Sequence, residues 1–153
     1  TVLRNGYLHS AIREKGGAYG SGAAQDSNNK VFKFFSYRDP KCSETFEEFQ
    51  KSRDWSLKEI SAEQLEEGIL GVISSIDKPL SPYGEAISDF MSELDNKTQA
   101  ERLLFRSRVK ECTLSDLVRV SEKYLFNDSK KSVIAGENFI KELTDLGFAI
   151  KNI

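Results

Sequence analysis

The sequence predicts an α+β fold in which helices cover one face of a mostly antiparallel sheet. A hairpin pattern occupies residues 17–37, a run of helical patterns follows over residues 45–126, and two short strand patterns lie at 131–135 and 147–150. These four short strands would make only a narrow sheet. We therefore expect a truncated domain, with partner strands preceding Thr1.

The beginning of the chain reads as a helix followed by the hairpin. Leu3, Tyr7 and Ile12 fall on one helical face, and the Gly16-Gly17 pair is expected to end the helix because glycine is favoured just past a helix end. The hairpin should consist of strands 17–25 and 30–37, joined by turn-forming residues 26–29. Because the apolar run 32–35 does not alternate, both faces of the second strand are expected to be covered.

Three helix starts are signalled by a hydroxyl residue with an acid or amide three positions later. The pairs are Thr45 with Glu48, Ser61 with Gln64, and Thr113 with Asp116. The first pair predicts a helix through about Trp55, and further helices are expected at 98–111, 114–126 and 137–145. After a proline-containing break at 77–82, one stripe is predicted to belong to the core: Ile87, Phe90, Met91 and Leu94.

Composition excludes several classes of function. The net charge is -2, which gives no electrostatic reason to expect nucleic acid or a membrane surface as partner. Two cysteines, Cys42 and Cys112, are too few for a disulfide scaffold and are expected to be reduced, partly buried thiols. The single histidine, His9, cannot supply a catalytic zinc site, which normally takes three protein ligands, mostly histidine.

The segment from Ile12 to Gly22 is rich in glycine, which costs backbone entropy in a strand. One interpretation is that a peptide pairs with this strand, where small side chains allow close approach and Arg13 and Tyr19 contact the ligand. The other is a crowded strand with no ligand role. Phosphate binding is not expected, because Gly20-Ser21-Gly22 leads into a strand and matches neither the P-loop nor the dinucleotide fingerprint.

The same residues carry a family resemblance. Tyr7-Leu8-His9, Ile12 to Gly20 and Phe34 to Pro40, which includes Ser36-Tyr37-Arg38-Asp39-Pro40, are together similar to the C-terminal domain of presequence proteases. These enzymes are a branch of the pitrilysin and insulin-degrading-enzyme family. The specific part of the resemblance covers residues 3–40, and the later helices match mainly in pattern.

The resemblance implies a LuxS/MPP-like metallohydrolase layer of helices on a sheet. It also implies that residues 1–153 are a fragment of the fourth, C-terminal domain of a two-lobed zinc peptidase that degrades short unstructured peptides, of the presequence or transit-peptide type. In that family the zinc site, an H-x-x-E-H motif with a distal Glu, belongs to another domain. This chain has no such motif, so we expect no metal ligand and no catalytic residue proper in it.

By position in the motif, the resemblance implies that Arg13 and Tyr19 reach the substrate, with Gly16 and Gly17 between them. Peptide hydrolysis builds negative charge on the scissile carbonyl oxygen, and a phenol or guanidinium close to that oxygen stabilises the transition state. The expected partners are therefore a peptide substrate and the zinc-bearing N-terminal half of the same polypeptide. The fragment alone is expected to be inactive.

Other polar residues are expected to have structural roles. His9 is predicted to be a surface or packing residue, and Tyr37, Arg38 and Asp39 to shape the end of the strand. The acidic residues Glu47, Glu48, Glu66 and Glu67 are expected on exposed helix faces.

Two alternatives remain open at this stage. The chain could be a non-catalytic peptide-binding or scaffolding domain of the same fold, or an unrelated small α/β ligand-binding module. The sequence does not give the compartment. The resemblance implies the cytoplasm for a bacterial protein and the interior of mitochondria or plastids for a eukaryotic one.

Overall fold

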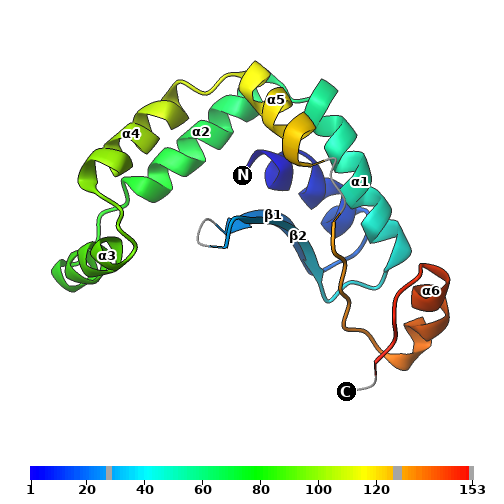
Figure 1. Ribbon diagram of the computed structural model, residues 1–153. Helices are drawn as coiled ribbons and strands as arrows, with labels where there is room; N and C mark the ends of the chain where they lie inside the picture. The colour runs from blue at the N-terminus through cyan, green and yellow to red at the C-terminus, as the bar shows by residue number, and fades with distance from the viewer. Residues whose placement is uncertain (27–28, 126–128, 152–153) are drawn as a thin grey trace. The chain divides into compact units, whose positions relative to one another are not determined.

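The computed structural model describes residues 1–26, 29–125 and 129–151. It divides into two compact units, Thr1–Ile60 with Leu117–Ile153, and Ser61–Asp116. Helices predominate, and the one sheet among the described residues is a two-stranded antiparallel hairpin (Figure 1). The expected mixture of helices with a small antiparallel sheet is therefore confirmed, although most of the chain is helical.

The first unit is built around η1 (Arg4–Glu14), a π-helix that lies between the hairpin and α1 (Ser43–Lys58) (Figure 1). Its buried side chains Leu8 and Ile12 form the core with Ala18. Because a π-helix closes its hydrogen bonds between residues five apart, positions four and five apart share a face. This spacing places Leu8 and Ile12 together.

The end of η1 is fixed by two glycines. The amide of Gly17 donates to the carbonyl of Arg13, and the amide of Ala18 donates to the carbonyl of Ile12. Gly17 has a φ of 84°, in the left-handed region that disfavours side chains. At Gly16, a Cβ atom would lie 2.4 Å from the Ile12 carbonyl oxygen. The predicted helix end is confirmed, and both positions need glycine for a backbone reason.

The hairpin consists of β1 (Gly20–Asp26) and β2 (Val31–Tyr37), paired from Gly20 opposite Tyr37 to Asp26 opposite Val31. The first strand begins three residues later than predicted, because Gly17 and Ala18 complete the helix end and Tyr19 lies between that end and the strand. Residues 27 and 28 of the predicted turn lie outside the described residues.

Only one face of β2 packs on the core, which corrects the expectation that both are covered. Phe34 stacks on Phe49 of α1, with ring centroids 5.4 Å apart, whereas Val31, Phe32 and Phe35 remain exposed. Neither edge of the hairpin has a strand neighbour among the described residues. An isolated two-stranded hairpin is marginally stable in water, so its packing against η1 is what holds it.

The start of α1 differs from the prediction. The helix begins at Ser43, and Glu142 of α6 (Ile140–Asp145) accepts a hydrogen bond of 2.7 Å from the Ser43 amide. The predicted capping box of Thr45 with Glu48 is wrong, because Thr45 lies inside the helix and donates to Asp39. A carboxylate distant in sequence therefore takes the place of the local cap.

Glu48 is also more than an exposed helix residue. Its carboxylate accepts hydrogen bonds of 2.7 Å from the hydroxyl of Tyr7 and the ammonium of Lys51. Burial alone would raise the pKa of Glu48, but these two hydrogen bonds, together with the positive charges of Lys51 and Lys15, hold the pKa below its usual value. Burial and the bond to Glu48 raise the pKa of Tyr7. The pair ties η1 to α1.

The predicted strands at 131–135 and 147–150 are wrong. The structure has no ladder at either segment. Gly147 has a φ of 81° and ends α6, and the ring of Phe148 packs against Phe46 at 5.6 Å. The predicted helix 137–145 is confirmed as a 3-10 turn, η2 (Glu137–Phe139), followed by α6.

The second unit contains α2 (Ala62–Ile76), α3 (Pro82–Leu94) and α4 (Gln99–Lys110). The predicted capping box of Ser61 with Gln64 opens α2, and Thr98 with Glu101 opens α4 in the same way. Thr113 with Asp116 opens α5 (Leu114–Tyr124), which bridges the two units in sequence. Residue 126 of the predicted helix lies outside the described residues.

The stripe on α3 is exposed, which corrects its assignment to the core. No residue of this helix is buried, and the exposed fractions of Phe90 and Leu94 are 58% and 60%. The spacing of Ile87, Phe90, Met91 and Leu94 is amphipathic as predicted. Within its own unit, however, the helix has nothing to bury this face against.

Replacing Gly17 tests the helix end. Gly17→Ala should lower the free energy of unfolding by about 1 kcal/mol, because a Cβ disfavours the left-handed conformation. Gly17→Asn is the matched control. Its free energy of unfolding should fall by less, since asparagine tolerates the left-handed region. Urea unfolding of the purified chain provides the measurement, and equal stability of Gly17→Ala and the parent chain would contradict the account.

The Tyr7–Glu48 contact predicts a pH dependence. Because the pKa of Glu48 is lower in the folded state, its ionised form stabilises the fold at neutral pH, and this contribution is lost as pH falls through the folded pKa. Glu48→Gln should therefore destabilise the chain at pH 7, and the difference should shrink toward pH 3. The exposed neighbour Glu47→Gln should change stability little at any pH, and a pH-independent effect of Glu48→Gln would refute the prediction.

Candidate functional site

Arg13 lies on the exposed side of η1, in its last turn. Its Nη1 lies 3.1 Å from Nε2 of His9, and Nδ1 of His9 lies 3.5 Å from Glu14. The four- and five-residue spacings of the π-helix allow one imidazole to meet both neighbours. In the tautomer whose Nε2 accepts from Arg13, Nδ1 bears the N–H group and faces the Glu14 carboxylate. His9 is thus a surface residue, as expected, and it contacts the candidate arginine.

Tyr19 lies on the other side of the glycine pair and immediately before β1. Its side chain is 60% exposed. The Tyr37 ring meets it edge-on, with centroids 5.6 Å apart, and the Arg38 guanidinium carbon lies 5.3 Å from the Tyr19 centroid. The amide of Tyr19 donates to the carbonyl of Arg38 at 3.2 Å. The ring is exposed but has defined neighbours.

Asp39 organises the turn after β2. Its carboxylate accepts hydrogen bonds from the hydroxyl of Ser36, from the hydroxyl of Thr45 at 2.7 Å and from the amide of Lys41 at 3.0 Å. These contacts confirm the predicted structural role of Asp39 at the strand end. The turn also joins the hairpin to the first turn of α1, through Thr45.

The glycines of β1 have a different explanation from the one that favoured a bound peptide. At Gly20 a Cβ atom would lie 2.4 Å from the Tyr37 ring, and at Gly22 it would lie 3.0 Å from the Phe35 ring. Rings of the cross-strand partners therefore fill the space beside both glycines. This favours the crowded-strand interpretation for Gly20 and Gly22.

The remaining acidic and thiol groups do not gather into a metal site. Within residues 1–26, 29–125 and 129–151, no group of three His, Cys, Asp or Glu side chains is placed to hold an ion. The described residues therefore do not fit the zinc site that the resemblance implies for the whole enzyme. Glu66 and Glu67 are exposed on α2, as predicted.

Both cysteines are free, which confirms the expectation of thiols. Burial is the main cause that raises the pKa of Cys42 and of Cys112, and nearby carboxylates add to it. A raised pKa leaves less thiolate, the form that acts as nucleophile or metal ligand. The raised pKa values therefore do not favour nucleophilic chemistry at either thiol.

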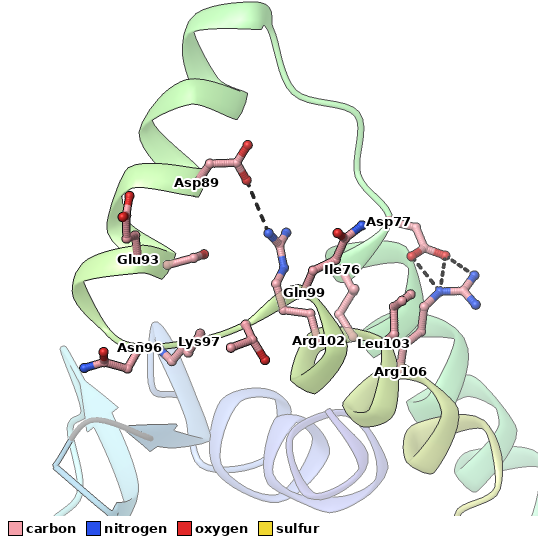
Figure 2. A pocket seen from close by; sticks show the side chains of 12 residues that line it. Ile76, Asp77, Asp89, Glu93, Asn96, Lys97, Gln99, Arg102, Leu103 and Arg106 are labelled. Carbon is pink, nitrogen blue, oxygen red and sulfur yellow. Dashed lines mark hydrogen bonds and ion pairs between the residues drawn. The ribbon is translucent and has the colours of Figure 1, made fainter.

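A pocket of about 780 Å³ lies within the second unit, between α3 and the facing ends of α2 and α4 (Figure 2). Both of its arginines pair with carboxylates that also line it. Arg106 Nε donates to Asp77 at 2.8 Å and holds the pKa of that carboxyl below its usual value, and Arg102 lies 3.5 Å from Asp89. Because both arginines of the pocket are already paired, it is a weaker candidate for binding an anionic group than the surface around Tyr19. Sequence reasoning did not single out any of its lining pairs.

The structure thus arranges the predicted residues around the end of η1. Arg13 lies in the last turn of the helix, Gly16 and Gly17 turn the chain, and Tyr19 follows immediately before the hairpin. Sequence reasoning treated Arg38 only as a strand-end residue and missed its contact with Tyr19. The signal was available in part, since Arg38 belongs to the motif that carries the resemblance.

None of the helices in the described part of the chain is long and apolar enough to cross a membrane. Both units present exposed polar and apolar side chains, and these features alone do not identify a family.

The chain is similar to curated presequence proteases described as mitochondrial. It is 33% identical to the protein from Saccharomyces cerevisiae over 149 residues, which is 96% of this chain and 15% of that protein. The identity is 35% with the Yarrowia lipolytica protein over 88% of this chain and 13% of the relative, and 38% with the Xenopus laevis protein over 81% of this chain and 12% of the relative. The chain therefore spans only a small part of these relatives' length.

The sequence model of the PreP C-terminal domain matches residues 1–137, which include the hairpin, the candidate site and the whole second unit. With this match and the identities above, the chain belongs to the family of PreP C-terminal domains, as its motifs indicated.

Proposed function

We propose that this chain is the substrate-binding C-terminal part of a zinc metallopeptidase that degrades short unstructured peptides. The observation that carries the proposal is the pair of exposed donors, Arg13 and Tyr19, on either side of the glycine turn in a chain of this family. The relatives' printed names, presequence protease, support presequence-type peptides as the substrate class.

The chemistry of the two side chains suits a peptide. A guanidinium offers several donors in fixed geometry to peptide carbonyls or a terminal carboxylate, and a phenol hydroxyl offers one more. Negative charge builds up on the carbonyl oxygen during hydrolysis, so donors that approach this oxygen stabilise the transition state. Gly16 and Gly17 contribute by fixing the helix end that separates the two donors.

The metal would be bound by another part of the same polypeptide, because the described residues do not fit a metal site. Two features support packing of this chain against a larger protein. Neither edge of the hairpin is paired with a further strand in the part of the chain that the structure describes, and the apolar face of α3 is exposed. Unpaired strand edges and large exposed apolar surfaces are typical of sites where another protein segment packs. For a eukaryotic protein, the relatives' names support a mitochondrial location.

The main experiment uses the full-length protein that contains this chain. Arg13→Ala and Tyr19→Phe should each lower kcat/KM for an unstructured fluorogenic peptide by at least about tenfold, because each removes a donor to the transition state. Zinc content, measured by mass spectrometry, should not change.

Matched controls lie in the same chain. Tyr124→Phe removes a phenol hydroxyl of similar exposure, 58%, and Arg102→Ala removes an exposed arginine of the second unit. Both should retain the activity of the parent protein. Activity that is equal in all four variants would refute the proposed roles of Arg13 and Tyr19.

The isolated chain provides a separate prediction. It should neither cleave the peptide nor bind zinc tightly in a 1:1 complex, because three suitable ligands do not meet among its described residues. Isothermal titration with zinc, followed by a peptide-cleavage assay, checks both points. Tight stoichiometric binding together with cleavage would show that the catalytic centre lies in this chain.

A further inference from the structure

We propose that Arg38 is a positioning residue that orients the Tyr19 phenol toward substrate. The motif Ser36 to Pro40 in turn fixes the position of Arg38. The inference rests on the proposed role of Tyr19 in substrate binding. It assigns a function to the second motif of the sequence, which the proposed function leaves without one.

Two consecutive residues contact both the ring and the backbone of Tyr19. The Arg38 guanidinium carbon lies 5.3 Å from the ring centroid, within the range of a cation–π contact, and the Tyr37 ring lies edge-on at 5.6 Å. The carbonyl of Arg38 accepts the Tyr19 amide at 3.2 Å. Backbone and ring are therefore positioned from one short segment.

The backbone of Arg38 is itself held in an unusual conformation. Its φ is 48°, which is uncommon for a residue with a side chain and persists where the surroundings enforce it. Asp39 supplies this constraint. Its carboxylate accepts hydrogen bonds from Ser36 before the turn, from the amide of Lys41 after it, and from Thr45 in the first turn of α1. The turn is thus secured independently of the Arg38 side chain.

Gly20 gives the Tyr37 ring its place. It pairs with Tyr37 across the hairpin, and an added Cβ would lie 2.4 Å from that ring. With no side chain at Gly20, the Tyr37 ring lies across the strand and reaches Tyr19, the preceding residue. The glycine that first suggested a bound peptide is therefore needed for an aromatic contact inside the chain.

Holding the ring has a consequence for binding. A tyrosine that is 60% exposed would otherwise lose rotamer freedom when a ligand binds, and a preordered ring avoids part of that loss. This effect acts through Tyr19 and requires no contact between Arg38 and substrate.

A double-mutant cycle in the full-length protein tests the inference, with kcat and KM measured on the unstructured fluorogenic peptide. Arg38→Met should lower kcat/KM about threefold when Tyr19 is present, the size expected of an exposed cation–π contact. It should have no effect in the Tyr19→Phe background, where no hydroxyl remains to position. Arg38→Lys keeps the charge and should restore part of the loss.

Two further variants complete the test. Gly20→Ala displaces the Tyr37 ring, so it should lower kcat/KM when Tyr19 is present and have no effect in the Tyr19→Phe background. This variant replaces Arg38→Met in the cycle if Arg38→Met does not fold. Lys33→Met removes a cation from β2 opposite Ala24 and should leave activity unchanged in both backgrounds. Urea midpoints identify variants that are merely unstable.

The outcomes separate this inference from the proposed function. A loss from Arg38→Met that is equal in the Tyr19 and Tyr19→Phe backgrounds would overturn the inference and show that Arg38 acts by another route. If Tyr19→Phe itself left kcat/KM unchanged, the proposed role of Tyr19 would fail, and the positioning role with it. Loss in the Tyr19 background alone, with partial rescue by lysine, supports both.

Discussion

The left-handed turn at Gly17 is the constraint on which the candidate site depends. The π-helix η1 buries Leu8 and Ile12, and its end must turn the chain at once into the hairpin that covers it. The bonds from Gly17 to Arg13 and from Ala18 to Ile12 close the helix at this point. Because the same turn separates Arg13 from Tyr19, the backbone geometry that completes the core also sets where the two donors lie.

The site combines two motifs that are distant in sequence. The first supplies Arg13, the glycine pair and Tyr19, and the second supplies Tyr37, Arg38 and Asp39. They meet because β1 and β2 pair in a register that places Gly20 opposite Tyr37. Each contact is weak, about 1 kcal/mol for an exposed cation–π pair. The Tyr19 ring has a defined position because Tyr37 and Arg38 both contact it.

The sequence predicted elements whose signals are local, and failed where distant contacts decide. Ser61 with Gln64 and Thr113 with Asp116 begin helices because each pair satisfies amides within one turn. Thr45 carries the same local pattern, but Asp39 and Glu142, which lie outside that pattern, determine the start of α1. Phe148 has strand-like neighbours yet packs as a single ring on Phe46, and local patterns cannot distinguish these outcomes.

The same limit applies to the site and to α3. The motif residues located Arg13, Gly16, Gly17 and Tyr19, but only coordinates could show that the rings of Phe35 and Tyr37 fill the space beside the strand glycines. The amphipathic pattern of α3 correctly indicated a face to be buried, but a pattern does not say what covers it.

We propose Arg13 and Tyr19 as the substrate-facing residues of a protein whose relatives are several times longer than this chain. A structure of the full-length protein, with its metal site inactivated and an unstructured peptide bound, tests this claim most directly. The account predicts that the Arg13 guanidinium and the Tyr19 hydroxyl lie within hydrogen-bond distance of the peptide backbone. A well-ordered peptide bound elsewhere, with both side chains facing solvent, would contradict it.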